Sequence, residues 1–148
     1  MEFKSFSPQE TKRFAGEFAE SVLRKAKGYG GGAFAVVLSG ELGAGKTTFV
    51  QGFTRGLGLR KKIQSPTFVF VRRYEISVGR FVDFYHIDAY RVRSKKDLVG
   101  LGLKEVFADS GNLVLVEWAE NVRGLLPKDA VWVRMRHGEH ENERYISI

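Results

Sequence analysis

The residues best suited to chemistry lie between Gly40 and Thr47, where the sequence reads Gly-Glu-Leu-Gly-Ala-Gly-Lys-Thr. This stretch matches the phosphate-loop pattern, in which a glycine and four free positions are followed by Gly-Lys and a hydroxyl residue. Its glycines allow a tight turn in which backbone N–H groups converge on one anion. The sequence therefore predicts a site for a nucleoside triphosphate.

The side chains at the end of the loop predict how ATP and Mg²⁺ are held. We expect Lys46 to contact the β- and γ-phosphates, Thr47 to bind Mg²⁺ and Thr48 to reach the α-phosphate. The backbone of Gly43, Ala44 and Gly45 is expected to hold phosphate oxygens as well. The alternative is a glycine-rich turn followed by an unrelated helix. Residues 34–38 predict a buried strand before the loop and residues 47–57 a helix after it, which disfavours that alternative.

Two carboxylates follow apolar runs and are candidates for the metal site and for catalysis. Four apolar residues precede Glu117, and the run 84–87 precedes Asp88. A phosphate loop needs such a carboxylate near the metal, at the end of another buried strand. The alternative is that these acids merely end strands. Because strand side chains alternate, His86 should face the same way as Asp88, either toward the phosphates or as an ordinary histidine with its hydrogen bonds satisfied. Trp118 is either a core residue or a wall of the nucleotide site.

The other elements predict the fold that positions these residues. Ser7, Pro8 and Glu10 open a helix that should reach about residue 27. Two hairpins are predicted, one of strands 68–76 and 80–87 and a closing one of strands 130–136 and 144–148. Between them we predict a stretch at 94–107 that is helical in part and interrupted at Gly100 and Gly102, a strand at 113–116 and a short helical piece at 119–125. We predict an α/β, three-layer fold like that of P-loop NTPases, with a mixed parallel and antiparallel sheet between helices, and one domain spanning residues 1–148.

The composition of the chain indicates which kinds of partner it can bind and in which cell compartment we expect it. The net charge is +7, from 24 Lys and Arg against 17 Asp and Glu, which suits anionic partners such as ATP and RNA. The linear sequence shows no aromatic-basic signature of an RNA-binding module, so contact with RNA is expected to be indirect or weak. The chain has no cysteine, which excludes disulfides and cysteine-based zinc sites. No run of 18 apolar residues occurs, so we expect a cytoplasmic protein without membrane contact.

Five blocks of sequence together resemble the bacterial TsaE (YjeE) family. They are Gly-Glu-Leu-Gly-Ala-Gly-Lys-Thr-Thr at 40–48, Ser-Pro-Thr-Phe at 65–68, His-Ile-Asp-Ala-Tyr-Arg at 86–91, Leu-Gly-Leu at 101–103 and Val-Glu-Trp-Ala-Glu at 116–120. The phosphate loop alone is generic, whereas these blocks in this order are specific.

The resemblance implies an ATPase that helps to form N6-threonylcarbamoyladenosine at position 37 of tRNA. Its expected partners are the TsaD and TsaB proteins, with ATP hydrolysis needed for repeated cycles. The resemblance implies that Lys46 and Thr48 contact phosphates and that Thr47 and Glu117 bind Mg²⁺. It implies that Asp88 and Trp118 are the functional residues of their sequence blocks. It further implies contact of Thr11 and the strand near Arg134 with the adenine end of the nucleotide, and a switch segment at residues 65–68.

Two other classes of protein also use a phosphate loop. A small-molecule kinase would transfer phosphate to an acceptor, but 148 residues leave little room for an acceptor domain and a lid. A binding module would use its nucleotide only to control association with protein or RNA. Product analysis separates the kinase from an ATPase, and turnover that is slow alone and stimulated by a partner indicates the binding module.

Overall fold

The computed structural model describes residues 1–60 and 70–148, in which seven strands form one sheet in the order β1-β7-β6-β2-β5-β4-β3. The strands are β1 (Glu2–Ser5), β2 (Phe34–Gly40), β3 (Val71–Val78), β4 (Phe81–Asp88), β5 (Asn112–Glu117), β6 (Val131–His137) and β7 (Arg144–Ser147). The helices are α1 (Pro8–Ala26), α2 (Lys46–Gly56) and α3 (Leu103–Ala108), with 3₁₀ segments η1 (Lys95–Leu98) and η2 (Ala119–Leu125).

The sheet is mixed, as predicted. Strands β6, β2, β5 and β4 are parallel to one another, while β3 pairs antiparallel with β4, and β7 with both β6 and β1. Because parallel strands end at the same edge, the residues that follow β2, β4 and β5 meet there. Crossover connections between the parallel strands place helices on both faces.

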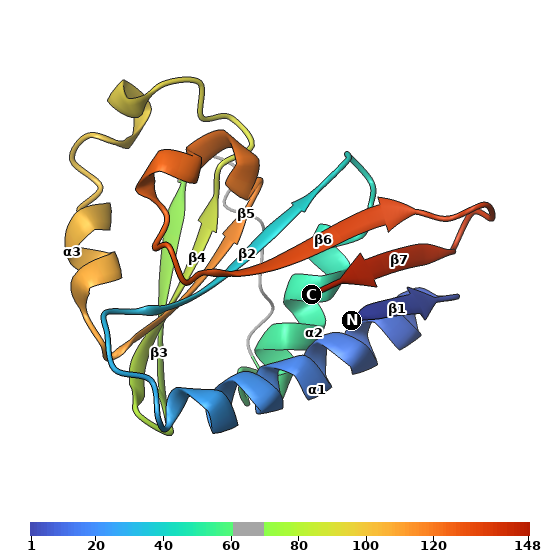
Figure 1. Cartoon of the computed structure of the whole chain (residues 1–148), viewed down its shortest axis with the longest axis horizontal. Helices are drawn as coiled ribbons and strands as arrows, with labels where there is room; N and C mark the ends of the chain where they lie inside the picture. The colour runs from blue at the N-terminus through green and yellow to red at the C-terminus, as the bar shows by residue number, and fades with distance from the viewer. Residues whose placement is uncertain (61–69) are drawn as a thin grey trace.

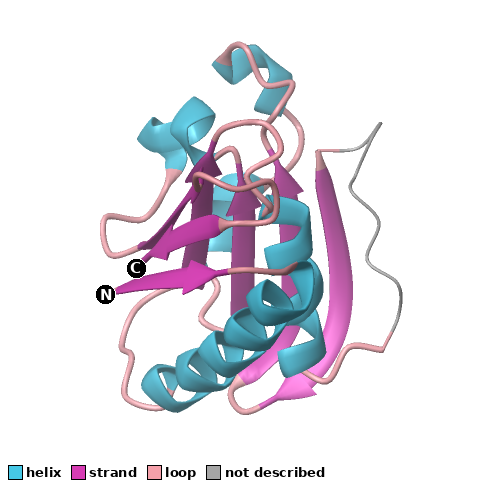
Figure 2. Cartoon of the chain, turned by 90° about the vertical axis from the view of Figure 1, so that its right-hand side faces the viewer, coloured by secondary structure: helices cyan, strands magenta, loops and turns pink. Residues whose placement is uncertain are grey.

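Three layers result from this arrangement. Helices α1 and α2 lie on one face of the sheet, and α3 with η1 and η2 lies toward the other (Figures 1 and 2). Helix α1 is amphipathic, with Phe14, Phe18 and Val22 buried and the opposite side exposed. Within the described ranges, no helix combines the length and the hydropathy needed to cross a membrane.

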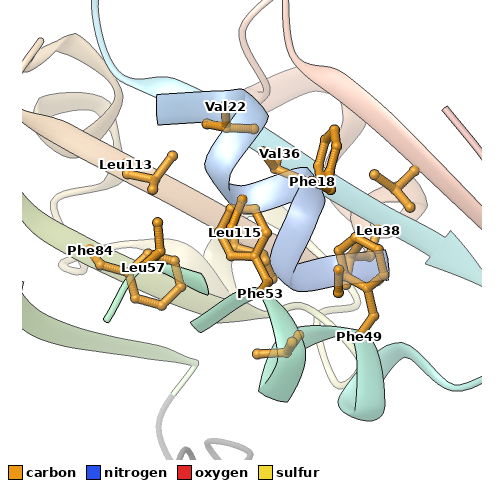
Figure 3. Packing of buried hydrophobic residues seen from close by; sticks show 14 of the residues in the cluster. Phe18, Val22, Val36, Leu38, Phe49, Phe53, Leu57, Phe84, Leu113 and Leu115 are labelled. Atoms are coloured by element: carbon orange, nitrogen blue, oxygen red, sulfur yellow. The ribbon is translucent and has the colours of Figure 1, made fainter. Parts of the chain in front are cut away.

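Large apolar side chains fix α1 and α2 against the sheet. Figure 3 shows Phe18 from α1 and Phe49 and Phe53 from α2 packed toward Leu38 and Leu115 of the central strands. Phe49, Phe53, Leu38 and Leu115 are fully buried. Burial of one such side chain contributes about 1.5–3 kcal/mol to stability. The beginning of α2 is therefore held at a fixed position above the ends of β2 and β5.

Helix α1 begins as the sequence predicts. The Ser7 hydroxyl accepts a hydrogen bond from the Glu10 N–H at 3.2 Å, and Pro8 occupies the first turn. The Glu10 carboxylate accepts a hydrogen bond from the Phe6 N–H at 2.8 Å. These contacts satisfy backbone donors that a helix start leaves free.

Some details of the chain differ from the sequence-based predictions. Strand β1 was not predicted, because its four residues have no strong apolar alternation, and it forms by pairing with β7. The stretch 94–107, by contrast, is helical in part and interrupted at Gly100 and Gly102 as predicted: it holds η1 and α3, and both glycines have positive φ angles. The predicted turn and switch segment at 65–68, and the first two residues of the strand predicted at 68–76, lie outside the described residues.

Helices α1 and α2 approach each other so closely that their backbones touch at glycines. A Cβ added at Gly52 of α2 would lie 2.3 Å from the Lys12 carbonyl oxygen of α1. A Cβ at Gly56 would lie 2.6 Å from the Gly16 carbonyl oxygen. Side chains at these positions would force the two helices apart.

We predict that Gly52→Ala destabilises the protein by about 1–3 kcal/mol, the usual cost of an overpacked core. We expect this loss to remain after the gain of about 1 kcal/mol that alanine brings to a helix interior, because the clash is with backbone atoms of α1 and cannot be relieved by moving a side chain. Urea unfolding of the variant and the parent measures the difference. Gly124→Ala is the matched control, because a Cβ at Gly124 meets no atom within 4 Å. Equal stability of the Gly52 variant and the parent would contradict the close helix packing.

Candidate nucleotide-binding site

The loop from Gly40 to Lys46 turns the chain from the end of β2 into α2 in a conformation that requires glycine. Gly43 and Gly45 have φ angles of 79° and 96°, which side chains other than glycine rarely adopt. A Cβ at Gly40 would lie 2.3 Å from the Met135 carbonyl oxygen of β6. Helix α2 begins at Lys46, so its first N–H groups and the positive end of its dipole face the loop.

Asp88 and Glu117 lie side by side beyond this loop. They are paired residues in the register of β4 and β5, and Glu117 in turn pairs with Leu38 of β2. Asp88 shares its face of β4 with His86, as strand alternation predicts, and this is the face that α2 covers. The two carboxylates are therefore placed by sheet pairing next to the first turn of α2.

Glu117 is held by a buried histidine. The Nε2 atom of His86 donates a hydrogen bond to Glu117 Oε2 at 2.6 Å, and both side chains are almost fully buried. The other ring nitrogen, His86 Nδ1, is buried without a hydrogen-bond partner among the described residues. This contact fixes the orientation of the carboxylate and leaves its second oxygen, Oε1, available for another ligand.

Lys46 is buried and folded back on its own loop. Its Nζ donates hydrogen bonds to the carbonyl oxygens of Gly40 at 2.5 Å and Glu41 at 2.8 Å. The same atom lies 3.9 Å from the centre of the Trp118 ring, a cation–π contact. Burial lowers the pKa of Lys46, while the nearby carboxylates of Glu120, Glu117 and Asp88 oppose that shift.

Trp118 and Tyr90 form one wall of the site. Their rings are 4.9 Å apart, centre to centre. Trp118 has a φ of 58°, a conformation uncommon for a large side chain, at the point where β5 turns into η2. The ring contacts Lys46 Nζ and also packs, partly buried, against the core cluster on the α3 side. Trp118 thus combines the two sequence-based interpretations, and its contact with nucleotide stays a prediction.

A cavity of about 420 Å³ opens between the phosphate loop and the two carboxylates. Its lining residues are Leu42, Gly43, Gly45, Lys46, Thr47, Thr48, Asp88, Tyr90, Glu117, Trp118 and Arg144. The residues 1–60 and 70–148 contain no group of three or more His, Cys, Asp or Glu side chains that could hold a metal by themselves. A pair of carboxylates with a threonine hydroxyl suits Mg²⁺ instead, because Mg²⁺ takes one or two carboxylates and completes its shell with phosphate and water.

Comparisons with known proteins identify the family. The family model for "Threonylcarbamoyl adenosine biosynthesis protein TsaE" matches residues 5–146. The chain belongs to the TsaE family. It is 36% identical over 136 residues to the tRNA threonylcarbamoyladenosine biosynthesis protein TsaE of Haemophilus influenzae, covering 92% of this chain and 80% of that protein. It is 33% identical over 144 residues to the protein of the same name from Bacillus subtilis, covering 97% of this chain and 82% of that protein.

A solved structure agrees with this assignment. The chain is similar to the crystal structure of Bacillus subtilis YdiB, with a TM-score of 0.66, 29% identity, and coverage of 99% of this chain and 82% of that chain. The family and the fold class predicted from sequence are therefore confirmed.

The structure brings most, but not all, of the predicted site residues of this TsaE-family chain to the cavity. Ala44 is fully buried, and its N–H donates to the Glu41 carbonyl oxygen. Thr11 lies on the buried side of α1, where its hydroxyl donates to Ser5 Oγ at 2.7 Å. Arg134 is exposed on the opposite face of the sheet, near Trp132. These three residues do not line the cavity, and the suggested contact of Thr11 and Arg134 with adenine stays a prediction.

Three lining residues were not predicted from the sequence. Arg144 begins β7, and its side chain passes within 3.9 Å of the Cβ position of Gly45. Tyr90 follows Asp88 by two residues, and its N–H donates to Asp88 Oδ1 at 3.0 Å. Leu42 lies in the loop itself, with 73% of its surface exposed. The predicted closing hairpin was the available signal for Arg144, because a hairpin beside β2 would bring its returning strand near the phosphate loop.

The titration of Asp88 predicts a stability effect. Burial raises the pKa of Asp88, the Tyr90 N–H opposes this and the Glu117 charge adds to it. Because the pKa of Asp88 is higher in the folded protein than in the unfolded chain, proton binding stabilises the fold. This stabilisation is complete at a pH below the pKa of the unfolded chain, and it is lost as the pH rises through the pKa of the folded protein. Asp88→Asn keeps an acceptor for Tyr90 without the charge. The variant should therefore unfold at higher urea concentration than the parent at pH 7.

The gain should shrink as the pH falls toward about 4, the ordinary pKa of aspartate in an unfolded chain. Asp109→Asn is the matched control. Asp109 is exposed and also accepts a hydrogen bond from the N–H two residues further on, that of Gly111, at 2.8 Å. An equal gain in both variants would show that burial of Asp88 is not the cause.

Proposed function

We propose that this chain binds ATP with Mg²⁺ and hydrolyses it to support formation of the threonylcarbamoyl group on adenosine 37 of tRNA, together with the TsaD–TsaB pair. Membership of the TsaE family supports the pathway. The observation that carries the proposed chemistry is the convergence of Lys46, Thr47, Asp88 and Glu117 on one cavity beside a glycine-shaped phosphate loop.

Charge and shape both favour a triphosphate in this cavity. Lys46 is the buried cation at its centre, and Arg144 lines it from β7. A phosphate group offers Lys46 stronger acceptors than the two carbonyl oxygens that it contacts here, because charge-assisted hydrogen bonds are the stronger ones. We expect Lys46 to leave these carbonyls and Trp118 when the phosphates bind.

Thr47 and Glu117 are the proposed ligands of Mg²⁺. The bound ion would neutralise the charge on the transferred phosphoryl group. His86 holds one oxygen of Glu117, which restricts the rotation of the carboxylate, and Glu117 lines the same cavity as Thr47. Fixed ligands cost no reorganisation when the metal binds.

Asp88 is proposed to orient the attacking water. Its carboxylate lines the same cavity as Lys46, and one oxygen is fixed by the Tyr90 N–H. The other oxygen can accept a hydrogen bond from a water molecule beside the γ-phosphate. Because burial raises the pKa of Asp88, this carboxylate is also a better proton acceptor than an exposed aspartate.

The central experiment measures ATP hydrolysis with and without the TsaD–TsaB pair. The variant Lys46→Ala tests whether this hydrolysis depends on the phosphate loop. We predict that the variant binds ATP at least about tenfold more weakly, a loss of about 1.4 kcal/mol, since it removes the buried cation of the site. Isothermal titration measures affinity, and phosphate release measures turnover. Phosphate found on a small acceptor rather than in water would instead indicate a kinase.

Lys104→Ala is the control for Lys46→Ala, because Lys104 is exposed on α3, away from the cavity. It should keep parental hydrolysis. A folded Lys46 variant with unchanged affinity and turnover would exclude the phosphate-loop mechanism.

Substitution of the two carboxylates should affect different steps, ATP binding with Mg²⁺ in one variant and hydrolysis in the other. Glu117→Gln should weaken the Mg²⁺-dependent part of ATP binding, because it removes the proposed ligand charge, while binding without Mg²⁺ changes little. Asp88→Asn should keep ATP affinity within about tenfold, or 1.4 kcal/mol, and lose hydrolysis. Titrations with Mg²⁺ and with EDTA, beside phosphate release, compare the two variants. Identical profiles for both would refute the separation of roles.

A further inference from the structure

The strands β6, β7 and β1 present a face that the family function does not explain. Along β6, Val133 and Met135 point into the core under α1 and α2, so Trp132, Arg134 and Arg136 point to the other side. Pairing in register adds Tyr145 of β7 and Lys4 of β1 to this side. In Figure 1 these strands extend to the right, away from α3, which lies at the left beside the other half of the sheet.

We call this the open sheet face and define it by Lys4, Arg123, Trp132, Arg134, Arg136 and Tyr145. All four of its cationic residues are exposed, and its two aromatic residues are partly exposed. The face therefore consists of aromatic rings on a sheet, surrounded by positive charge.

Each ring lies beside two cations. The guanidinium carbons of Arg123 and Arg134 are 4.6 Å and 5.5 Å from the centre of the Trp132 ring. Arg136 and Lys4 lie 3.9 Å and 5.3 Å from the centre of the Tyr145 ring. Such contacts keep the cations close to the rings, and the exposed guanidinium groups can still donate hydrogen bonds to other partners.

Acidic residues compensate only part of this charge. Glu2 lies 3.5 Å from Arg136, with both side chains more than half exposed, so water weakens the pair. Glu143 is buried and pairs with Lys4 at 2.6 Å. Arg123 and Arg134 lie against Trp132 without an ion pair to any described residue. The surplus is positive, as is the net charge of +7 for the chain.

We propose that the open sheet face binds single-stranded RNA. Bases of an unpaired segment stack on partly exposed aromatic rings, and phosphates pair with the surrounding arginines. A sheet surface that carries both groups provides these contacts without deep pockets.

RNA fits this face better than a protein partner does. The centre of a protein interface is usually apolar and depleted in charge. Here cations surround both aromatic rings. The exposed hydrophobic residue next to the face is another aromatic one, Phe6, whose ring centre lies 5.2 Å from Lys4 Nζ, while Leu42 and Val99 lie elsewhere in the described chain. Charge complementarity therefore favours a polyanion with aromatic bases.

The test is fluorescence anisotropy with a labelled unmodified tRNA transcript and a labelled ten-nucleotide single strand, without ATP. We expect affinity for both probes to fall steeply with salt, since bound phosphates release counterions. The double variant Arg123→Gln/Arg136→Gln should bind at least tenfold more weakly. Loss of two phosphate contacts should also lower the slope of log affinity against log salt by about 1.4.

A stacking variant gives a different signature. Trp132→Leu should reduce affinity roughly 5- to 150-fold, the effect of one lost base stack of about 1–3 kcal/mol, with the salt slope unchanged. Circular dichroism and urea unfolding confirm that each variant is folded. If the salt dependence of affinity changes in the arginine variant and not in Trp132→Leu, base stacking and electrostatic attraction make separate contributions to binding.

The matched control is Arg13→Gln/Arg55→Gln, which removes the same two charges from exposed positions on α1 and α2. It should change affinity less than threefold. An equal loss in both double variants would show nonspecific attraction by net charge and overturn the proposal. Absence of RNA binding by the parent, or binding of an acidic protein surface in its place, would also overturn it.

This proposal does not depend on ATP hydrolysis. Lys46→Ala should retain the RNA affinity of the parent even where it loses ATP binding. Failure of the nucleotide mechanism and failure of the RNA face therefore give different results.

Discussion

The parallel pairing of β2, β5 and β4 is the constraint on which the site depends. Register places Leu38, Glu117 and Asp88 in one row across three strands, so both carboxylates reach the edge where β2 turns into the phosphate loop. A shift of one residue in either pairing would turn a carboxylate to the opposite face. The fully buried apolar residues of β2 and β5 make such a shift costly, because they would exchange their positions in two different cores.

Helix packing completes the position of the loop. Phe49 and Phe53 anchor α2 to the sheet, and the contact at Gly52 sets how closely α1 lies against it. The first turn of α2 thus has little freedom relative to Glu117. Within this rigid frame, two charged groups are held at some cost: burial lowers the pKa of Lys46 and raises that of Asp88. Such opposed shifts are common where a site is organised for a charged ligand.

The face of the sheet opposite α1 and α2 has an apolar part and a cationic part. Beside α3 and η2, apolar residues such as Val37 and Val116 are buried. Toward β1, the corresponding side carries arginines around Trp132 and Tyr145. Strand β6, which pairs with β2, therefore carries a cationic surface on this face, and Arg134 belongs to that surface and does not line the cavity.

The sequence by itself determined the phosphate loop, its flanking strand and helix, the cap of α1 at Ser7, and the apolar runs that end in Asp88 and Glu117, because these depend on local spacing and residue type. It also identified the family. Only the tertiary structure decided that His86 holds Glu117 and that Arg144 reaches the loop. It also decided that Thr11 and Arg134 lie on different faces of the sheet and that β1 forms by pairing with β7. The same holds for the rings and cations of the open sheet face, which come from η2 and three strands. Each of these contacts joins residues distant in the chain, and strand order and register, which local periodicity does not encode, set them.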